Sequence, residues 1–127
     1  MFNVLLVGIG GFIGSVARYL ASGYVQQITQ SADFPYGTLA VNLIGCFVIG
    51  VLAELADARG VFTTESRAFV FVGVLGGFTT FSSFSNETMN LMRDGETLPA
   101  LANVTVHIVV GLGAVWLGRL VAHAIWG

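Results

Sequence analysis

The residues best able to do chemistry stand in a single run in the second half of the chain. The run reads Gly76-Gly77-Phe78-Thr79-Thr80-Phe81-Ser82-Ser83-Phe84-Ser85-Asn86-Glu87. Two glycines followed by two threonines weaken a helix, and a helix that breaks inside a membrane frees carbonyl oxygens that must be buried or bind a cation. If two such breaks met at a two-fold axis, their oxygens could surround one small ion. A kinked but unbroken glycine-rich packing helix explains the same composition about equally well.

The same run carries groups that suit an anion. Phe81 and Phe84 are three residues apart and share a helix face, and Thr80, Ser83 and Glu87 form a polar stripe beside them. Ring edges carry partial positive charge, so rings and hydroxyls could hold an anion without a full counter-charge. On spacing alone, ordinary packing of the two rings is the favoured interpretation.

Two further polar pairs occur at a spacing of one helical turn. Thr38 and Asn42 form one pair, and Asn103 and His107 form the other. The amide of Asn42 offers two donors, which suit an anion or an interhelical hydrogen bond. No cluster has the spacing of a transition-metal site, and no nucleophile–base set is visible, so the sequence does not indicate an enzyme.

The elements that carry these residues are predicted by the distribution of charge. Only 9% of the 127 residues are charged, and the charge-free runs 1–17, 34–53, 68–86 and 97–118 approach the roughly 20 residues that a spanning helix needs. We expect an all-α membrane protein with helices at about 3–21, 37–57, 67–92 and 99–125, joined by polar segments at 26–33, 58–66 and 93–96. Residues 1–127 thus form a single four-helix transmembrane domain. Five arginines, no lysine and a net charge of −2 exclude a basic face for nucleic acid.

Small residues and arginines predict how these helices associate. Four-residue spacing of small residues lets helices approach closely in lipid, and three pairs fit: Gly10/Gly14, Gly73/Gly77 and Ala114/Gly118. Arg59, Arg67 and Arg119 fall on one side of the membrane, and Arg18 and Arg93 fall on the other. This split gives almost no orienting bias and therefore permits insertion both ways and an antiparallel homodimer, although five charges are few to judge by.

Three motifs together resemble the CrcB/Fluc family of fluoride channels. The run Gly76 to Ser85 is similar to the family's signature of two glycines, Leu or Phe, Thr-Thr-Phe-Ser, Ser or Thr, and Phe-Ser. The other two motifs are Gly37-Thr38-Leu39-Ala40-Val41-Asn42-Leu43-Ile44-Gly45 and Gly10-Gly11-Phe12-Ile13-Gly14-Ser15-Val16-Ala17-Arg18-Tyr19. The resemblance extends over essentially the whole chain.

The resemblance implies a passive channel that exports cytoplasmic fluoride from the bacterial cell, with two pores in an antiparallel, dual-topology homodimer in the cell membrane. It makes Asn42 a vestibule amide and Phe81 and Phe84 a ring-edge pair. The other residues that we expect along the fluoride pathway are Thr38, Arg18, Ser82 and Ser83. The backbone carbonyls of Gly76 and Thr79, doubled by the dimer, would hold a structural Na⁺ at the interface.

Two other functions fit four short helices. A small multidrug-type proton-coupled exporter is the alternative, but it requires an acidic residue in the middle of its first helix, and residues 3–21 contain none. A non-conducting assembly subunit would explain the glycines but not the hydroxyl-rich run.

Overall fold

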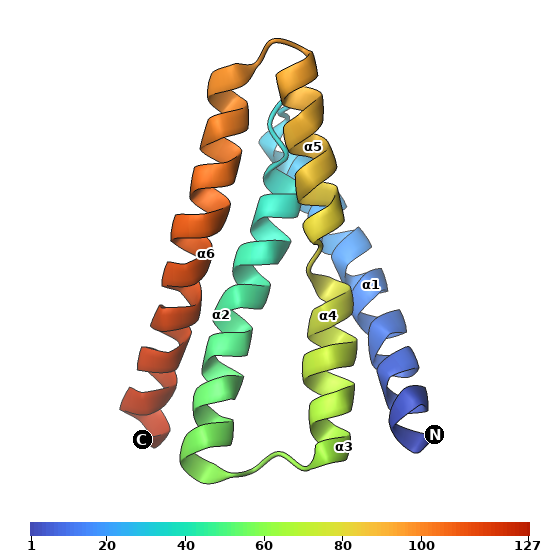
Figure 1. The fold of residues 1–127 in the computed structure, drawn as a ribbon, viewed down its shortest axis with the longest axis vertical. Helices are drawn as coiled ribbons and strands as arrows, with labels where there is room; N and C mark the ends of the chain where they lie inside the picture. Colours follow the sequence, from blue (N-terminus) through green and yellow to red (C-terminus); the bar gives the residue numbers. More distant parts are fainter.

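The computed structural model describes residues 1–127 and contains helices but no β-strand (Figure 1). Four helical segments, Phe2–Thr29, Tyr36–Arg59, Thr64–Arg93 and Thr97–Trp126, are long and apolar enough to cross a membrane. The first, second and fourth are the single helices α1 (Phe2–Thr29), α2 (Tyr36–Arg59) and α6 (Thr97–Trp126). The third consists of α3 (Thr64–Arg67), the π-helix η1 (Ala68–Leu75), α4 (Gly76–Phe78) and α5 (Phe81–Arg93). The predicted multi-pass, all-α architecture is confirmed.

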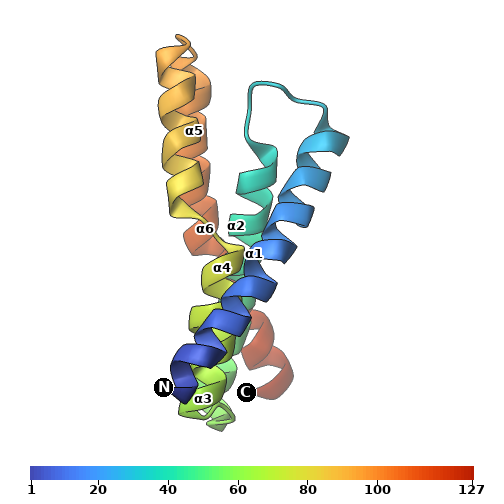
Figure 2. The ribbon, with the colours of Figure 1, turned by 90° about the vertical axis from the view of Figure 1, so that its right-hand side faces the viewer.

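The four segments run alternately up and down. Both chain ends lie beside the α2–α3 connection, and the α1–α2 and α5–α6 connections lie at the opposite end (Figure 1). Helix α2 packs mainly along α6, and α1 packs mainly along η1 and α4. Seen from the side, α5 with the adjoining half of α6 leans away from α1 and α2 (Figure 2). The third segment therefore contacts α1 with its first half and α6 with its second half.

The third segment breaks near its middle. Thr79 (φ −98°, ψ 158°) and Thr80 (φ −148°, ψ 113°) are extended and separate α4 from α5. The Gly-Gly-Phe-Thr-Thr sequence thus produces a true break rather than a kink. Because helix α5 begins anew at Phe81, its N-terminus points into the middle of the bundle.

Close approach of glycines holds the first half of the bundle together. A Cβ at Gly10 would meet the Phe69 carbonyl oxygen at 2.5 Å, and one at Gly14 would overlap the Val74 carbonyl oxygen. A Cβ at Gly77 would come within 2.8 Å of the Gly11 carbonyl oxygen. Helix α1 and the third segment therefore touch backbone to backbone, as the four-residue spacing of their glycines predicted.

The helix boundaries differ most for α1, which ends at Thr29 and not near residue 21. Residues 22–29 include no proline, so the backbone hydrogen bonds of the helix can continue past Ala21. Gln26 lies inside α1 and ties the turn that follows, donating to the carbonyl oxygen of Phe34 (3.1 Å) and accepting from the Gly37 N–H (3.0 Å). At the start of the third segment, the Thr63 hydroxyl caps the helix by accepting from the Ser66 N–H at 3.1 Å.

Candidate functional site

The helix break is held by a side chain from the neighbouring helix. Asn42 of α2 binds the Thr80 peptide twice: its Oδ1 accepts from the Thr80 N–H (2.8 Å), and its Nδ2 donates to the Thr80 carbonyl oxygen (3.2 Å). In a continuous α-helix the Thr80 N–H would bind the carbonyl of Gly76, four residues earlier. Asn42 therefore replaces a helical hydrogen bond and stabilises the extended conformation.

Helix α5 starts with a side-chain cap. The Thr80 hydroxyl accepts from the Ser83 N–H at 3.2 Å and donates to the Ser83 hydroxyl at 3.1 Å. The Ser82 hydroxyl lies 3.4 Å from the same Thr80 oxygen. A Thr at the N-cap position is the sequence signal for this cap, but Thr80 and Ser83 fit a polar stripe on one continuous helix equally well. The hydroxyls of Thr80, Ser82 and Ser83 instead form a cluster at the N-terminus of α5, where the helix dipole is positive.

Both carbonyls predicted to bind a cation lose their helical donors at the break. The Thr80 N–H, the donor for Gly76 O, is taken by Asn42, and the Ser83 N–H, the donor for Thr79 O, is taken by the Thr80 hydroxyl. Carbonyl oxygens freed in this way are the ligands that unwound membrane helices offer to Na⁺. No group of three or more His, Cys, Asp or Glu side chains could hold a metal ion. The residues present therefore fit a cation bound through backbone oxygens.

Arg18 lies at the break. Its Nε donates to the carbonyl oxygen of Gly77 at 2.9 Å, so it binds one of the carbonyls freed between α4 and α5. Because α1 continues to Thr29, Arg18 is part of the helical span and not next to its end. The positive charge of its guanidinium is thus brought near the N-terminus of α5.

The two phenylalanines of the run lie together, as their spacing predicted. The ring centroids of Phe81 and Phe84 are 5.5 Å apart, and Phe81 is 78% exposed. The Phe84 ring also packs on the imidazole of His107 from α6, at a centroid distance of 4.2 Å. Phe84 thus joins α5 to α6, whereas Phe81 faces outward from the chain.

His107 completes a chain of hydrogen bonds that begins at the break. Its Nε2 lies 3.0 Å from Asn42 Nδ2, and its Nδ1 lies 3.0 Å from the carbonyl oxygen of Asn103. A carbonyl oxygen only accepts, so Nδ1 carries the hydrogen and Nε2 accepts from Asn42. Both amide hydrogens of Asn42 are consequently in use, one on Thr80 and one on His107.

A second polar contact joins α2 to α5 one turn beyond Asn42. The Thr38 hydroxyl donates to Glu87 Oε2 at 3.0 Å, and the other carboxylate oxygen of Glu87 is buried without a partner. Asn103 is fully buried and donates to the Thr88 hydroxyl at 2.9 Å, a contact that the sequence did not indicate. Thr38 and Asn42, which the sequence pairs, thus make neighbouring contacts between α2 and the third segment.

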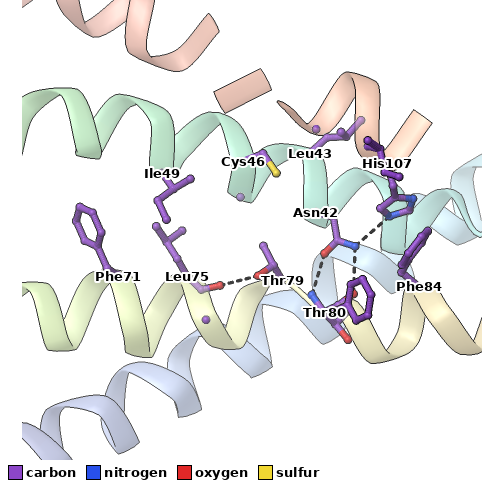
Figure 3. A pocket seen from close by; sticks show the side chains of 15 residues that line it. Asn42, Leu43, Cys46, Ile49, Phe71, Leu75, Thr79, Thr80, Phe84 and His107 are labelled. Carbon is purple, nitrogen blue, oxygen red and sulfur yellow. Dashed lines mark hydrogen bonds between the residues drawn. The ribbon is translucent and has the colours of Figure 1, made fainter. Parts of the chain in front are cut away.

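Several of these groups line one pocket of about 430 Å³. Its lining includes Asn42, Thr79, Thr80, Phe84 and His107 at a polar end and Ile49, Phe71 and Leu75 at an apolar end (Figure 3). Gly76 and Phe81 also line the pocket. Of the predicted site residues, Asn42, Phe81, Phe84, Gly76 and Thr79 line it, while Arg18, Thr38, Ser82 and Ser83 do not.

Comparison with known proteins assigns the chain to a family. The family model described as "CrcB-like protein, Camphor Resistance (CrcB)" matches residues 5–119. The chain belongs to the CrcB family. The match includes the break, Asn42 and His107, so the whole pocket lies within the CrcB region.

Curated CrcB relatives are similar over nearly their full length. The fluoride-specific ion channel FluC of Methylobacillus flagellatus is 48% identical over 118 residues, which are 93% of this chain and 92% of that protein. FluC of Methylocella silvestris is 46% identical over 125 residues, or 97% and 95% of the two chains. FluC 1 of Methanosarcina acetivorans is 40% identical over 122 residues, or 96% and 92%. The assignment to CrcB argues against the proton-coupled exporter as an alternative.

Proposed function

We propose that the protein is a fluoride-selective channel that lets the anion leave the cytoplasm passively. The observation that carries the proposal is the helix break, which sets the N-terminus of α5, its hydroxyl cluster and the Phe81–Phe84 pair beside the Asn42 amide. The relatives compared above are all named fluoride-specific ion channels.

The pathway that we propose offers weak donors in succession. The hydroxyls of Ser82 and Ser83 and the ring edges of Phe81 and Phe84 can each replace part of the hydration shell of fluoride. The Thr38 hydroxyl and the Asn42 amide can do so once they release Glu87 and His107. Arg18 and the dipole of α5 add positive potential near the break. Conduction requires that an anion bind favourably enough to enter the pathway and weakly enough to leave it. Several modest donors meet this requirement better than one strong cationic site.

The conducting unit that we propose is an antiparallel homodimer with two pores. Phe81 supports this proposal, because its ring is 78% exposed although it stands at the break. A second chain, inverted with respect to the first, would bring its own Phe81 and Phe84 to this surface. Arg59, Arg67 and Arg119 lie toward one end of the bundle, Arg93 lies toward the other, and Arg18 lies at the break. So few arginines near the helix ends constrain insertion only weakly, as dual topology requires.

A structural Na⁺ at the two-fold axis of this dimer is the cofactor that we propose. Gly76 O and Thr79 O lack their helical donors, whereas Gly77 O is occupied by Arg18. Two copies of the free pair would supply four oxygen ligands. The ion would neutralise the carbonyls of the two breaks and fix their relative position.

Fluoride efflux from liposomes tests the proposal. Vesicles that contain the purified protein are loaded with potassium fluoride, a potassium ionophore starts the efflux, and a fluoride electrode follows it at equal pH on both sides. We expect rapid fluoride efflux and far slower chloride efflux. Equal passage of both halides, or efflux that requires a proton gradient, would contradict a selective passive channel.

A further inference from the structure

His107 accepts a hydrogen bond from the one amide hydrogen of Asn42 that is not bound to Thr80. The Asn42 carboxamide cannot turn over, because its Oδ1 accepts from the Thr80 N–H at 2.8 Å and its Nδ2 donates to the Thr80 carbonyl oxygen at 3.2 Å. The remaining Nδ2 hydrogen points at His107 Nε2, 3.0 Å away. An anion in the pocket could use this donor only after the imidazole has given it up.

The orientation of the imidazole is fixed on its other side. Nδ1 donates to the Asn103 carbonyl oxygen at 3.0 Å, and the ring packs against Phe84 at a centroid distance of 4.2 Å. Neutral His107 therefore directs its Nε2 lone pair at the Asn42 amide and offers no donor to an anion. A proton on Nε2 would convert this acceptor into a donor facing a second donor, the Asn42 amide.

Two donors that face each other can share an anion between them. We infer that His107 is a positioning residue that, when neutral, withholds the Asn42 amide from fluoride and, when protonated, releases that amide and adds an N–H of its own. The flux test of this inference rests on the proposed function, whereas the protonation state of the imidazole can be tested without it. The ring face of Phe84 would stabilise the imidazolium by a cation–π contact.

His107 is the main group in the pocket whose charge responds to pH, because few other charged or titratable groups surround it. Cys46 of α2 is the only other titratable side chain in the lining. Glu87, on α5 one turn beyond Phe84, is bound to Thr38, and Arg18 of α1 is bound to Gly77 O. On α6 no charged residue lies between Thr97 and Gly118. An imidazolium at position 107 would thus have an anion as its natural counter-charge, so that proton and anion binding reinforce each other.

The flux test compares His107 with the other histidine of the chain. Flux at sub-saturating fluoride is measured at equal pH on both sides, from about pH 7.5 to about pH 5.5, the range in which imidazoles ordinarily change charge. Leakage of uncharged HF is subtracted with protein-free vesicles. We expect wild-type flux to rise about threefold or more on acidification, a factor that corresponds to less than 1 kcal/mol of barrier. His107→Gln keeps an acceptor for Asn42 but does not titrate, so its flux should stay level.

His123 provides the matched control, because it lies at the far end of α6, 3.4 Å from Glu54. His123→Gln, Cys46→Ser and Glu87→Gln should each keep the wild-type rise. A His107→Gln variant with an unchanged rise, a level wild-type profile, or a flux that falls on acidification would each overturn the role of His107. Absence of fluoride flux from the wild type at every pH would overturn the proposed function and this role together.

Nitrogen NMR of the imidazole tests the inference independently of conduction. At about pH 7.5 the ¹⁵N shifts of His107 should show a protonated Nδ1 and an unprotonated Nε2, and Asn42→Leu should alter the Nε2 shift. A proton on Nε2 at that pH would overturn the arrangement, whatever the protein conducts.

Discussion

The carboxamide of Asn42 and the peptide of Thr80 are joined by two hydrogen bonds, of 2.8 and 3.2 Å. Through this contact a residue of α2 takes over a hydrogen bond that α4 would otherwise have used to continue into α5. The contact explains how a strongly apolar span can tolerate two extended residues at its middle. It also sets the N-terminus of α5 beside the amide that holds it.

Substitutions at Asn42 separate its role in the break from its role toward the anion. Asn42→Asp keeps an oxygen for the Thr80 N–H, so we expect a folded protein, but its charge repels fluoride and should abolish flux. Asn42→Leu leaves the Thr80 N–H without its acceptor and should lower stability by about 1–3 kcal/mol. Thermal unfolding in detergent and fluoride efflux measure the two effects. A conducting Asn42→Asp variant would contradict the placement of this residue in the pathway.

Phe81→Ile and Phe84→Ile test whether the rings act on the anion. Isoleucine keeps apolar bulk but has no positive ring edge, so each substitution should cut fluoride flux about tenfold or more, which corresponds to about 1.4 kcal/mol of barrier. Phe12→Ile is the control, because Phe12 lies on α1 and is 72% exposed, much like Phe81. Size-exclusion chromatography should show the same species for all three. Flux close to wild type in both variants would assign the pair to packing alone.

Gly14→Ala tests the backbone contact between α1 and the third segment. A Cβ there would overlap the Val74 carbonyl oxygen, and backbone on both sides leaves no side chain to move away. We expect a loss of about 1–3 kcal/mol, typical of overpacking. Gly8→Ala makes the same change on the same helix at a position with nothing within 4 Å, and it should be neutral or slightly stabilising. Equal melting temperatures for the two variants would contradict the contact.

Removal of sodium tests the proposed cation. Exchange of Na⁺ for a bulky organic cation at constant ionic strength should lower the melting temperature, since a ligand at about 100 times its dissociation constant contributes about 2.7 kcal/mol. Addition of Na⁺ should restore it. The same melting temperature with and without Na⁺ would remove the ion from the proposed dimer.

Labelling of a single cysteine tests dual topology. In a Cys46→Ala background, Val61→Cys places a thiol in the connection between α2 and α3, where Val61 is 60% exposed. A membrane-impermeant maleimide should label about half of the chains in intact cells and the rest after lysis, because so few arginines orient the chain only weakly. Labelling that is complete from one face would exclude the antiparallel dimer.

The features that follow from charge and glycine spacing could be predicted from the sequence. Runs without charge indicate all four spans, and the Gly76-Gly77 and Thr79-Thr80 pairs indicate where the third span is weakened, but they fit a kink as well as the break that the structure shows. The contact between Asn42 and Thr80 depends on how α2 and the third segment are placed against each other, which no local pattern specifies. The same is true of His107, whose partners Asn42 and Phe84 lie on two other helices. The end of α1 at Thr29 does not follow from the sequence pattern, because polarity alone does not stop a helix.

The reversal potential of a reconstituted bilayer tests the central claim most directly. With opposed gradients of fluoride and chloride, a common cation at equal concentration and equal pH on both sides, a fluoride-selective channel should show zero current near the fluoride equilibrium potential. That potential is about 59 mV for each tenfold fluoride ratio. A reversal potential that follows the chloride gradient, or a current that appears only when a pH gradient is imposed, would contradict passive fluoride-selective conduction.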